Sequence, residues 1–142
     1  MLRSGNQLSE GVKDMQRKAA GGFVKRAEEQ GFSSVEQGEG VEMAWLVSRE
    51  DGAQNFEMRK FRIKPGGGLP KHMHPEIEHE QYVLKGRMKV GINNEVHDVK
   101  AGDVIYIPAG AFHWYVNDSD EDVEFICVIP KKNEYKTVYD KC

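Results

Sequence analysis

Apolar and polar positions alternate with a period of two over most of the chain from residue 41 onward. Alternation in short runs rich in β-branched and aromatic residues indicates half-buried β-strands. The runs cover residues 41–48, 55–64, 80–85, 87–92, 95–100, 104–107, 112–116 and 123–129. Turn-forming residues separate them at 51–52, 65–68, 93–94, 101–103 and 108–110. Many short strands at this spacing predict an all-β sandwich or barrel.

A different period marks the segment before residue 41. Its apolar residues recur at spacings of three or four, at Val12, Met15, Ala19, Phe23 and Ala27. This spacing predicts a helix over residues 9–31, with Ser9 as the N-cap and Gly31 at the end. Gly21-Gly22 interrupts the pattern, so two short helices fit it as well as one. We therefore expect a helical N-terminal extension over residues 1–40, followed by a β-barrel domain over residues 41–142.

Composition narrows the classes of function. The chain has 142 residues, a length typical of one domain with a substantial core. Its 20 basic and 23 acidic side chains form neither a basic field for nucleic acid nor a polybasic run for a membrane surface. No apolar run is long enough to span a bilayer, and the first residues do not suggest a signal peptide. We therefore expect a cytoplasmic protein with a small-molecule ligand and no nucleic-acid or membrane partner.

The two cysteines fit a cytoplasmic protein. Cys127 lies in an apolar run and is interpreted as a small core residue, whereas Cys142 ends the chain. A disulfide between them stays open, but no feature of the sequence requires one.

Four of the five histidines cluster in two short stretches of the sequence. His72 and His74 are two residues apart, so in an extended strand both point to the same face. His79 begins the next predicted strand, and His113 begins another after the turn at 108–110. Imidazole is a common ligand for first-row transition metals. The pattern therefore predicts one metal ion held between strands.

The spacing of these residues resembles the two motifs of the cupin family. Five residues separate Gly66 from His72-Met73-His74, four more lead to His79, and six more lead to Gly86. The second motif is matched without a gap by Gly102, Pro108, Gly110, His113 and Asn117. The resemblance implies a small jelly-roll barrel over roughly residues 41–130. It also implies a metal ion bound by residues of both motifs, here His72, His74, His79 and His113.

One position departs from the usual cupin pattern, because His79 stands where the family usually has a glutamate. Some single-domain cupins have a histidine there and are similar to this chain. Glu78 or Glu80 could supply the carboxylate instead, but strand parity favours His79 and turns Glu80 outward. Four neutral imidazoles leave the charge of a divalent ion uncompensated, which favours an anionic ligand. They suit Fe, Zn, Ni, Cu or Co, and Mn is common among cupins.

Two further residues are candidates for the substrate pocket. Arg59 shares a strand face with Phe61 and would pair with a substrate carboxylate if that face points inward. A surface arginine at a sheet edge is an equally good interpretation. Gln81 shares the face of His79 and would either support the metal ligands or simply form part of the pocket wall. The remaining histidine, His97, lies between charged residues and is expected to be exposed and to take no part in metal binding.

The leading functional hypothesis is a small metalloenzyme of the dioxygenase or isomerase type, acting on an oxygen-bearing anionic small molecule. The ion would act as a Lewis acid with open coordination positions. The rival hypothesis is a non-catalytic module that binds or senses a metal or metabolite, and a closed structural zinc site is a further alternative. Because cupin barrels usually dimerise, the resemblance also implies a homodimer, for which residues 1–40 are a candidate contact.

Overall fold

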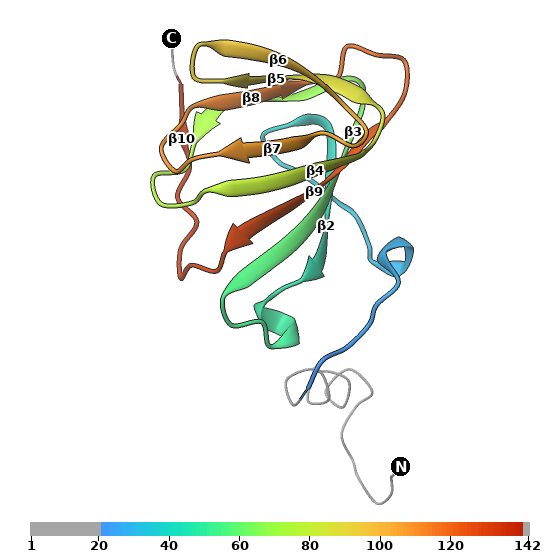
Figure 1. The fold of residues 1–142 in the computed structure, drawn as a ribbon, viewed down its shortest axis with the longest axis vertical. Helices are drawn as coiled ribbons and strands as arrows, with labels where there is room; N and C mark the ends of the chain where they lie inside the picture. Colours follow the sequence, from blue (N-terminus) through green and yellow to red (C-terminus); the bar gives the residue numbers. More distant parts are fainter. Residues whose placement is uncertain (1–20, 141–142) are drawn as a thin grey trace, which may run out of the picture.

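The computed structural model describes residues 21–140, in which short antiparallel strands dominate (Figure 1). In chain order the elements are η1 (Ala27–Glu29), β1 (Ser33–Ser34), β2 (Glu39–Val47), η2 (Arg49–Asp51), β3 (Phe56–Met73), β4 (His79–Lys85), β5 (Arg87–Ile92), β6 (Glu95–Lys100), β7 (Val104–Ile107), β8 (His113–Val116), β9 (Val123–Pro130) and β10 (Val138–Tyr139). The predicted all-β architecture is confirmed. Seven of the eight predicted strands lie within two residues of their expected bounds, whereas the strand expected at 55–64 continues to Met73.

The long strand β3 connects the two halves of the sheet. Residues 56–63 of β3 pair with β9 on one side, and the same half of the strand pairs with β2 on the other. Beyond them, residues 68–73 pair with β8 and β10. The strand order is β6-β5-β8-β3-β9-β4-β7, so one end of β3 belongs to each half. Figure 1 shows that the sheet curls around this strand into an open barrel.

The predicted turn at residues 65–68 is wrong, because these residues lie inside β3 where it changes partners. Gly66 has a φ of +81°, a left-handed conformation that glycine adopts without strain. A Cβ at Gly67 would lie 2.4 Å from the Glu39 carbonyl oxygen, and one at Gly68 would lie 2.2 Å from that of Tyr115. The glycines therefore serve a close backbone approach within a continuous strand.

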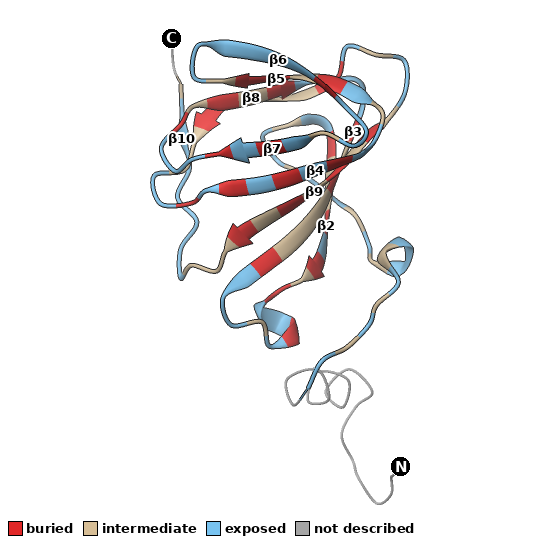
Figure 2. Cartoon of the chain, viewed as in Figure 1, coloured by how far each residue is buried: buried red, intermediate tan, exposed pale blue. Residues whose placement is uncertain are grey.

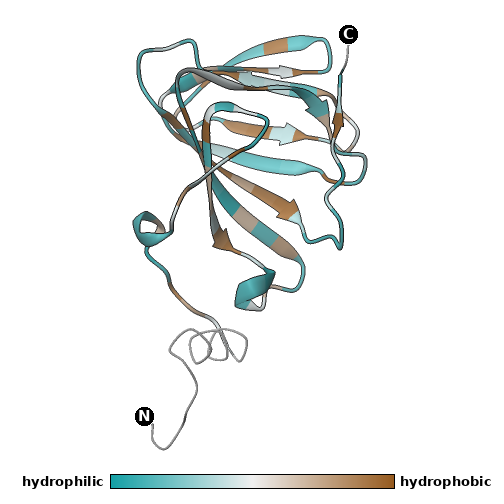
Figure 3. Cartoon of the chain, turned by 180° about the vertical axis from the view of Figure 1, so that it is seen from behind, coloured by the Kyte–Doolittle hydropathy of each residue, from teal (hydrophilic) through white to brown (hydrophobic). Residues whose placement is uncertain are grey.

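The buried side chains alternate along the strands, as Figure 2 shows. On β9 every second residue from Val123 to Ile129 is buried, and β4 follows the same rule from His79 to Val83. Hydropathy follows burial less closely, because His79 and Gln81 are buried but hydrophilic. Figure 3 shows largely hydrophilic and largely hydrophobic stretches of strand in the same sheet. Phe61 and Tyr115 each stack on Phe125, with ring centroids 5.2 and 5.4 Å apart. The core lies inside the curl, where it also forms the floor of a pocket.

The predicted N-terminal helix is wrong in the part that the structure describes. Residues 9–20 lie outside the described residues, and residues 21–26 are not helical; one 3-10 turn, η1, follows them. Two glycines at 21–22 oppose helix formation. The segment is held by contacts with the barrel instead: the Lys25 ammonium lies 2.9 Å from an Asp51 carboxylate oxygen, and the Arg62 guanidinium lies 4.1 Å from the Phe32 ring.

Cys127 is buried in the core and is not part of a disulfide, whereas Cys142 lies outside the described residues. Between residues 21 and 140 there is no helix long and apolar enough to cross a membrane. The division of the chain at residue 40 stays a prediction, and β1 already pairs with β2 at Ser33–Ser34.

Candidate metal centre

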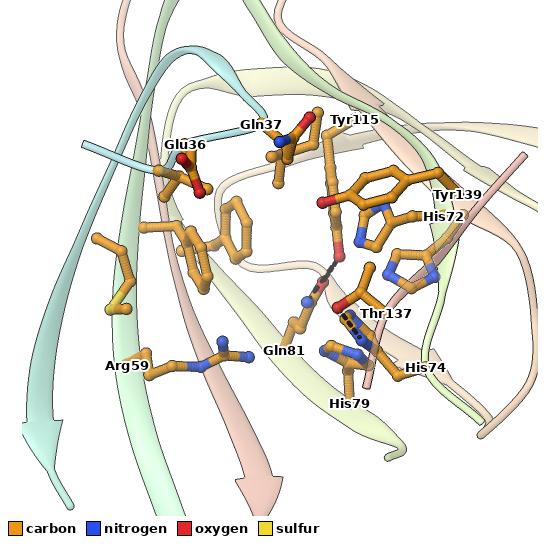
Figure 4. A pocket seen from close by; sticks show the side chains of 16 residues that line it. Glu36, Gln37, Arg59, His72, His74, His79, Gln81, Tyr115, Thr137 and Tyr139 are labelled. Carbon is orange, nitrogen blue, oxygen red and sulfur yellow. Dashed lines mark hydrogen bonds between the residues drawn. The ribbon is translucent and has the colours of Figure 1, made fainter. Parts of the chain in front are cut away.

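Four histidines from three parts of the curled sheet meet at one end of the pocket. His72 lies near the end of β3, His74 follows that strand, and His79 and His113 are the first residues of β4 and β8. The pairing of β3 with β8 sets His72 opposite His113, with ring centroids 4.2 Å apart. The ring of His79 lies 5.1 Å from the rings of both His74 and His113. Figure 4 shows three of these side chains at the pocket wall.

The histidines are not equivalent in their mutual distances. One ring nitrogen from each of His72, His74 and His113 lies within 4.8 Å of the other two, which is close enough for one metal ion to bind all three. His79 falls outside this tighter group, although its ring contacts two of the three. The structure therefore places a triad together with a fourth imidazole beside it.

Hydrogen bonds fix the proton on three of the four rings. The pairs are His72 with the Pro70 carbonyl (2.6 Å), His74 with that of Lys136 (2.9 Å) and His113 with that of Ala111 (3.0 Å). A carbonyl oxygen can only accept, so Nδ1 carries the proton in each ring and Nε2 keeps its lone pair. His79 differs, because its Nδ1 lies 3.3 Å from the Cys127 sulfur.

The Nε2 atoms of His79 and His113 are buried and have no hydrogen-bond partner among the described residues. An unpartnered buried polar atom is unfavourable by about 1–3 kcal/mol in protein interiors. A metal ion bound at these nitrogens would satisfy them, and imidazole donors suit a first-row transition ion. The residues present therefore fit such an ion.

Burial keeps these imidazoles neutral. It lowers the pKa of His79 to about 2, with the Arg59 guanidinium adding to the effect, and that of His113 to about 3, with His72 adding to it. Burial also lowers the pKa values of His72 and His74. Neutral imidazole is the form that binds a metal, so these rings do not need to lose a proton near neutral pH.

The pocket that the histidines line has a volume of 260 Å³ and extends toward the β2–β3 hairpin. Both predicted pocket residues lie in its wall. Gln81 is buried, and its amide donates to the Tyr115 hydroxyl at 2.8 Å. Arg59 lies with its guanidinium 3.1 Å from the Cys127 sulfur, and its Nε is buried without a hydrogen-bond partner among the described residues. Figure 4 shows Arg59 directed into the pocket.

Sequence reasoning missed part of the pocket wall. Thr137 and Tyr139 line it from the C-terminal segment, and Glu36 and Gln37 line it from the loop before β2. No motif or periodic pattern marked these positions. Tyr115 also lines the pocket, whereas the aromatic residues Trp45 and Tyr106 are exposed.

The two carboxylates considered as alternatives to His79 do not belong to the histidine cluster. Glu78 and Glu80 are exposed, and Glu80 lies on the outward face of β4, as strand parity predicts. His97 is exposed on β6, as expected of a histidine outside the ligand set.

Comparison with known proteins agrees with the motif and the fold. The family model described as "Cupin domain" matches residues 59–129, which is half of the chain. The chain belongs to the cupin family. It is 33% identical over 115 residues to the oxalate-binding protein of Thermotoga maritima, covering 76% of this chain and 93% of that protein.

Two solved structures extend the likeness to this cupin's fold. The polyketide cyclase RemF from Streptomyces resistomycificus superposes with a TM-score of 0.75 at 28% identity, over 84% of this chain and 87% of that one. A predicted oxalate decarboxylase from Thermotoga maritima gives a TM-score of 0.70 at 29% identity, over 78% of this chain and all of that one. The resemblance to the cupin jelly-roll is therefore confirmed.

Proposed function

We propose that this cupin binds one divalent transition-metal ion through His72, His74, His79 and His113, and uses it to act on a small anionic, oxygen-bearing molecule. The observation that carries the proposal is the set of Nδ1–H tautomers fixed by backbone carbonyls, beside two buried Nε2 atoms that have no partner among the described residues. Such outer hydrogen bonds are typical of metal-binding histidines.

The pocket next to the histidines combines a cationic group, which suits a small anion, with apolar side chains. Arg59 offers a guanidinium whose Nε has no hydrogen-bond partner among the described residues, and this group would hold a carboxylate or another anionic group. Phe61 and Phe125 add apolar surface to the lining of the same pocket. The bound ion would supply Lewis acidity. Gln81 and Tyr115, paired with each other, would orient the ligand and exclude water.

A reaction of the dioxygenase or isomerase type is our leading proposal, and a binding or sensing module is the second candidate. The name of the Thermotoga maritima relative, an oxalate-binding protein, favours the module, whereas that of RemF, a polyketide cyclase, favours an enzyme. An enzyme would release a chemically altered molecule, whereas a binding module would release the bound molecule unchanged.

Metal content tests the ligand set. We expect purified protein loaded with Mn²⁺, Co²⁺ or Zn²⁺ to hold about one ion per chain by elemental analysis after dialysis. His113→Ala removes a buried ligand and is expected to lower the content well below one ion while the β-sheet circular dichroism persists. The matched control is His97→Ala, which changes an exposed histidine and should keep full content. Equal metal content in the two variants would remove His113 from the ligand set.

A small dicarboxylate tests the pocket and the choice between the two functions. Oxalate is the probe, added to metal-loaded protein under air and followed by calorimetry and by mass spectrometry of the small molecule. We expect Arg59→Gln to weaken binding about tenfold or more, since it removes a charge-assisted hydrogen bond, and exposed Arg87→Gln to leave it unchanged. Consumption of oxalate indicates an enzyme, and binding without consumption supports the module. Equal affinity in both arginine variants would contradict the role of Arg59.

A further inference from the structure

The chain continues past β9, beyond the region that the cupin model matches, and returns to the pocket. Residues 131–140, here called the C-terminal strap, leave Pro130 and end in β10, which pairs with β3 beside the histidines. In that pairing Tyr139 lies opposite His72, and Val138 lies opposite Met73. Figure 1 shows the strap rising along the open side of the barrel.

The strap contacts the metal centre through its backbone. The Lys136 carbonyl oxygen accepts a hydrogen bond from His74 Nδ1 at 2.9 Å, and the Thr137 hydroxyl lies 3.2 Å from the same nitrogen. For His72 and His113 the acceptor is only two residues away in the chain, whereas for His74 it lies 62 residues away. His74 is therefore the histidine whose orientation depends on a distant segment.

The strap is anchored at Tyr135. The Tyr135 hydroxyl donates to Glu57, a carboxylate buried on the inward side of β3, and also contacts the Arg49 guanidinium. Arg49 lies 5.2 Å from the centre of the Tyr135 ring and donates to the Lys132 carbonyl oxygen at 2.6 Å. Its backbone N–H and its Nε both reach Glu57. The strap is thus fastened to the barrel at Tyr135, immediately before the residues that reach His74.

We propose that the C-terminal strap is part of the functional site, with Tyr135 as a positioning residue that holds the Lys136 carbonyl against His74. The strap fixes the Nδ1–H tautomer of His74 and so presents its Nε2 to the metal ion, while Thr137 and Tyr139 form one wall of the pocket. The part concerning the ion rests on the proposed function. The part concerning the tautomer of His74 does not rest on the proposed function, because the tautomer is a property of the metal-free protein.

The test compares Tyr135→Ala with Tyr82→Ala in the full-length chain. Tyr82 is an exposed tyrosine on the outward face of β4, so its variant removes the same side chain away from the pocket. The first readout is long-range ¹H–¹⁵N correlation NMR of the histidine rings in metal-free protein. We expect a pure Nδ1–H signal for His74 in the unaltered protein and in Tyr82→Ala, and a mixture of tautomers in Tyr135→Ala. The second readout is Co²⁺ affinity by competition with a chelator, for which Tyr135→Ala should be about tenfold weaker.

The two readouts separate the possible failures. If His74 keeps its tautomer and Co²⁺ affinity changes less than twofold in Tyr135→Ala, the strap has no positioning role. If the unaltered protein binds no Co²⁺, the proposed function fails, and the tautomer of His74 still decides the role of the strap. Should Tyr135→Ala give little folded protein, Tyr135→Phe keeps the ring beside Arg49, removes the hydroxyl that reaches Glu57, and undergoes the same two measurements.

Discussion

Polar side chains inside this barrel divide into those with complete hydrogen bonding and those without. Asn117 is fully buried, yet its amide donates to the carbonyl oxygens of Ile63 and Glu121 and its oxygen accepts from Ser119. Such a residue stabilises the fold. Arg59, His79 and His113 each keep one buried nitrogen without a partner among the described residues. Because that arrangement is unfavourable in a purely structural role, these three atoms point to a ligand.

Glu57 is expected to make folding stability depend on pH in the acid range. Burial raises its pKa, but hydrogen bonds from Arg49 and Tyr135 outweigh this and lower it below the ordinary 4.5. Since the folded-state pKa is the lower one, the stabilisation is full above about pH 4.5 and is lost as the pH falls through the folded-state pKa. Urea unfolding of metal-free protein between pH 3 and 6 measures this pH dependence of the free energy of unfolding.

A substitution at Glu57 isolates the contribution of this carboxylate to the pH dependence of stability. Glu57→Gln should be less stable than the unaltered protein near neutral pH, and its acid slope should be smaller by up to about 1.4 kcal/mol per pH unit, the effect of one proton. Glu95→Gln, at an exposed carboxylate on β6, should keep the full slope. An unchanged slope in Glu57→Gln would show that this carboxylate is not held ionised by its partners.

At the scale of elements, the glycines of β3 allow one strand to serve both halves of the sheet. The Gly66 N–H donates to the Asn117 carbonyl oxygen, and the Asn117 N–H donates to that of Gly67, at 2.8 and 2.9 Å. The two sequence motifs are thus hydrogen-bonded to each other away from the histidines. A second such link joins the Gly110 N–H to the His74 carbonyl oxygen at 2.9 Å. The motif residues therefore position the strands that carry the ligands.

Gly68→Ala tests the close approach at this crossing. The added Cβ would lie 2.2 Å from the Tyr115 carbonyl oxygen, so the backbone of β3 or β8 has to shift. We expect a loss of about 3 kcal/mol in the free energy of unfolding, at the upper end of typical overpacking effects. Gly31→Ala is the control, since nothing lies within 4 Å of its Cβ, and it should change stability by less than about 0.5 kcal/mol. Equal losses in the two variants would contradict the steric argument.

Most strands could be predicted from sequence because they bury one face, and alternation at period two records that burial directly. The turn at residues 65–68 could not be distinguished from a strand crossing, since glycine is common to both. The spacing of the histidines indicated where four imidazoles would meet. It could not reveal the strap, because Lys136 acts through a backbone carbonyl, which carries no sequence signal. The non-helical course of residues 21–26 depends on tertiary contacts such as that of Lys25 with Asp51.

The whole molecule has two kinds of sheet surface. The inward faces form the core and the pocket, while the outward face of β4 and β7 is apolar in part. Its exposed large side chains are Tyr82, Leu84, Val104 and Tyr106. Tyr82 and Val104 lie opposite each other in the pairing of the two strands, so they form one patch. Exposed apolar patches of this kind commonly mark contact surfaces between proteins.

We predict that this patch contacts a second copy of the chain in a two-fold dimer, in which the same face meets itself. Light scattering at low micromolar concentration should then give twice the 16.1 kDa mass of the chain. Val104→Lys places a charge within the patch and should yield the monomer, because a buried unpaired charge opposes association. Val96→Lys is the matched control, since Val96 is also exposed but lies on β6, in the other half of the sheet. A monomeric unaltered protein would refute the dimer, and a dimer that survives Val104→Lys would move the contact to another surface, for which residues 1–40 are the next candidate.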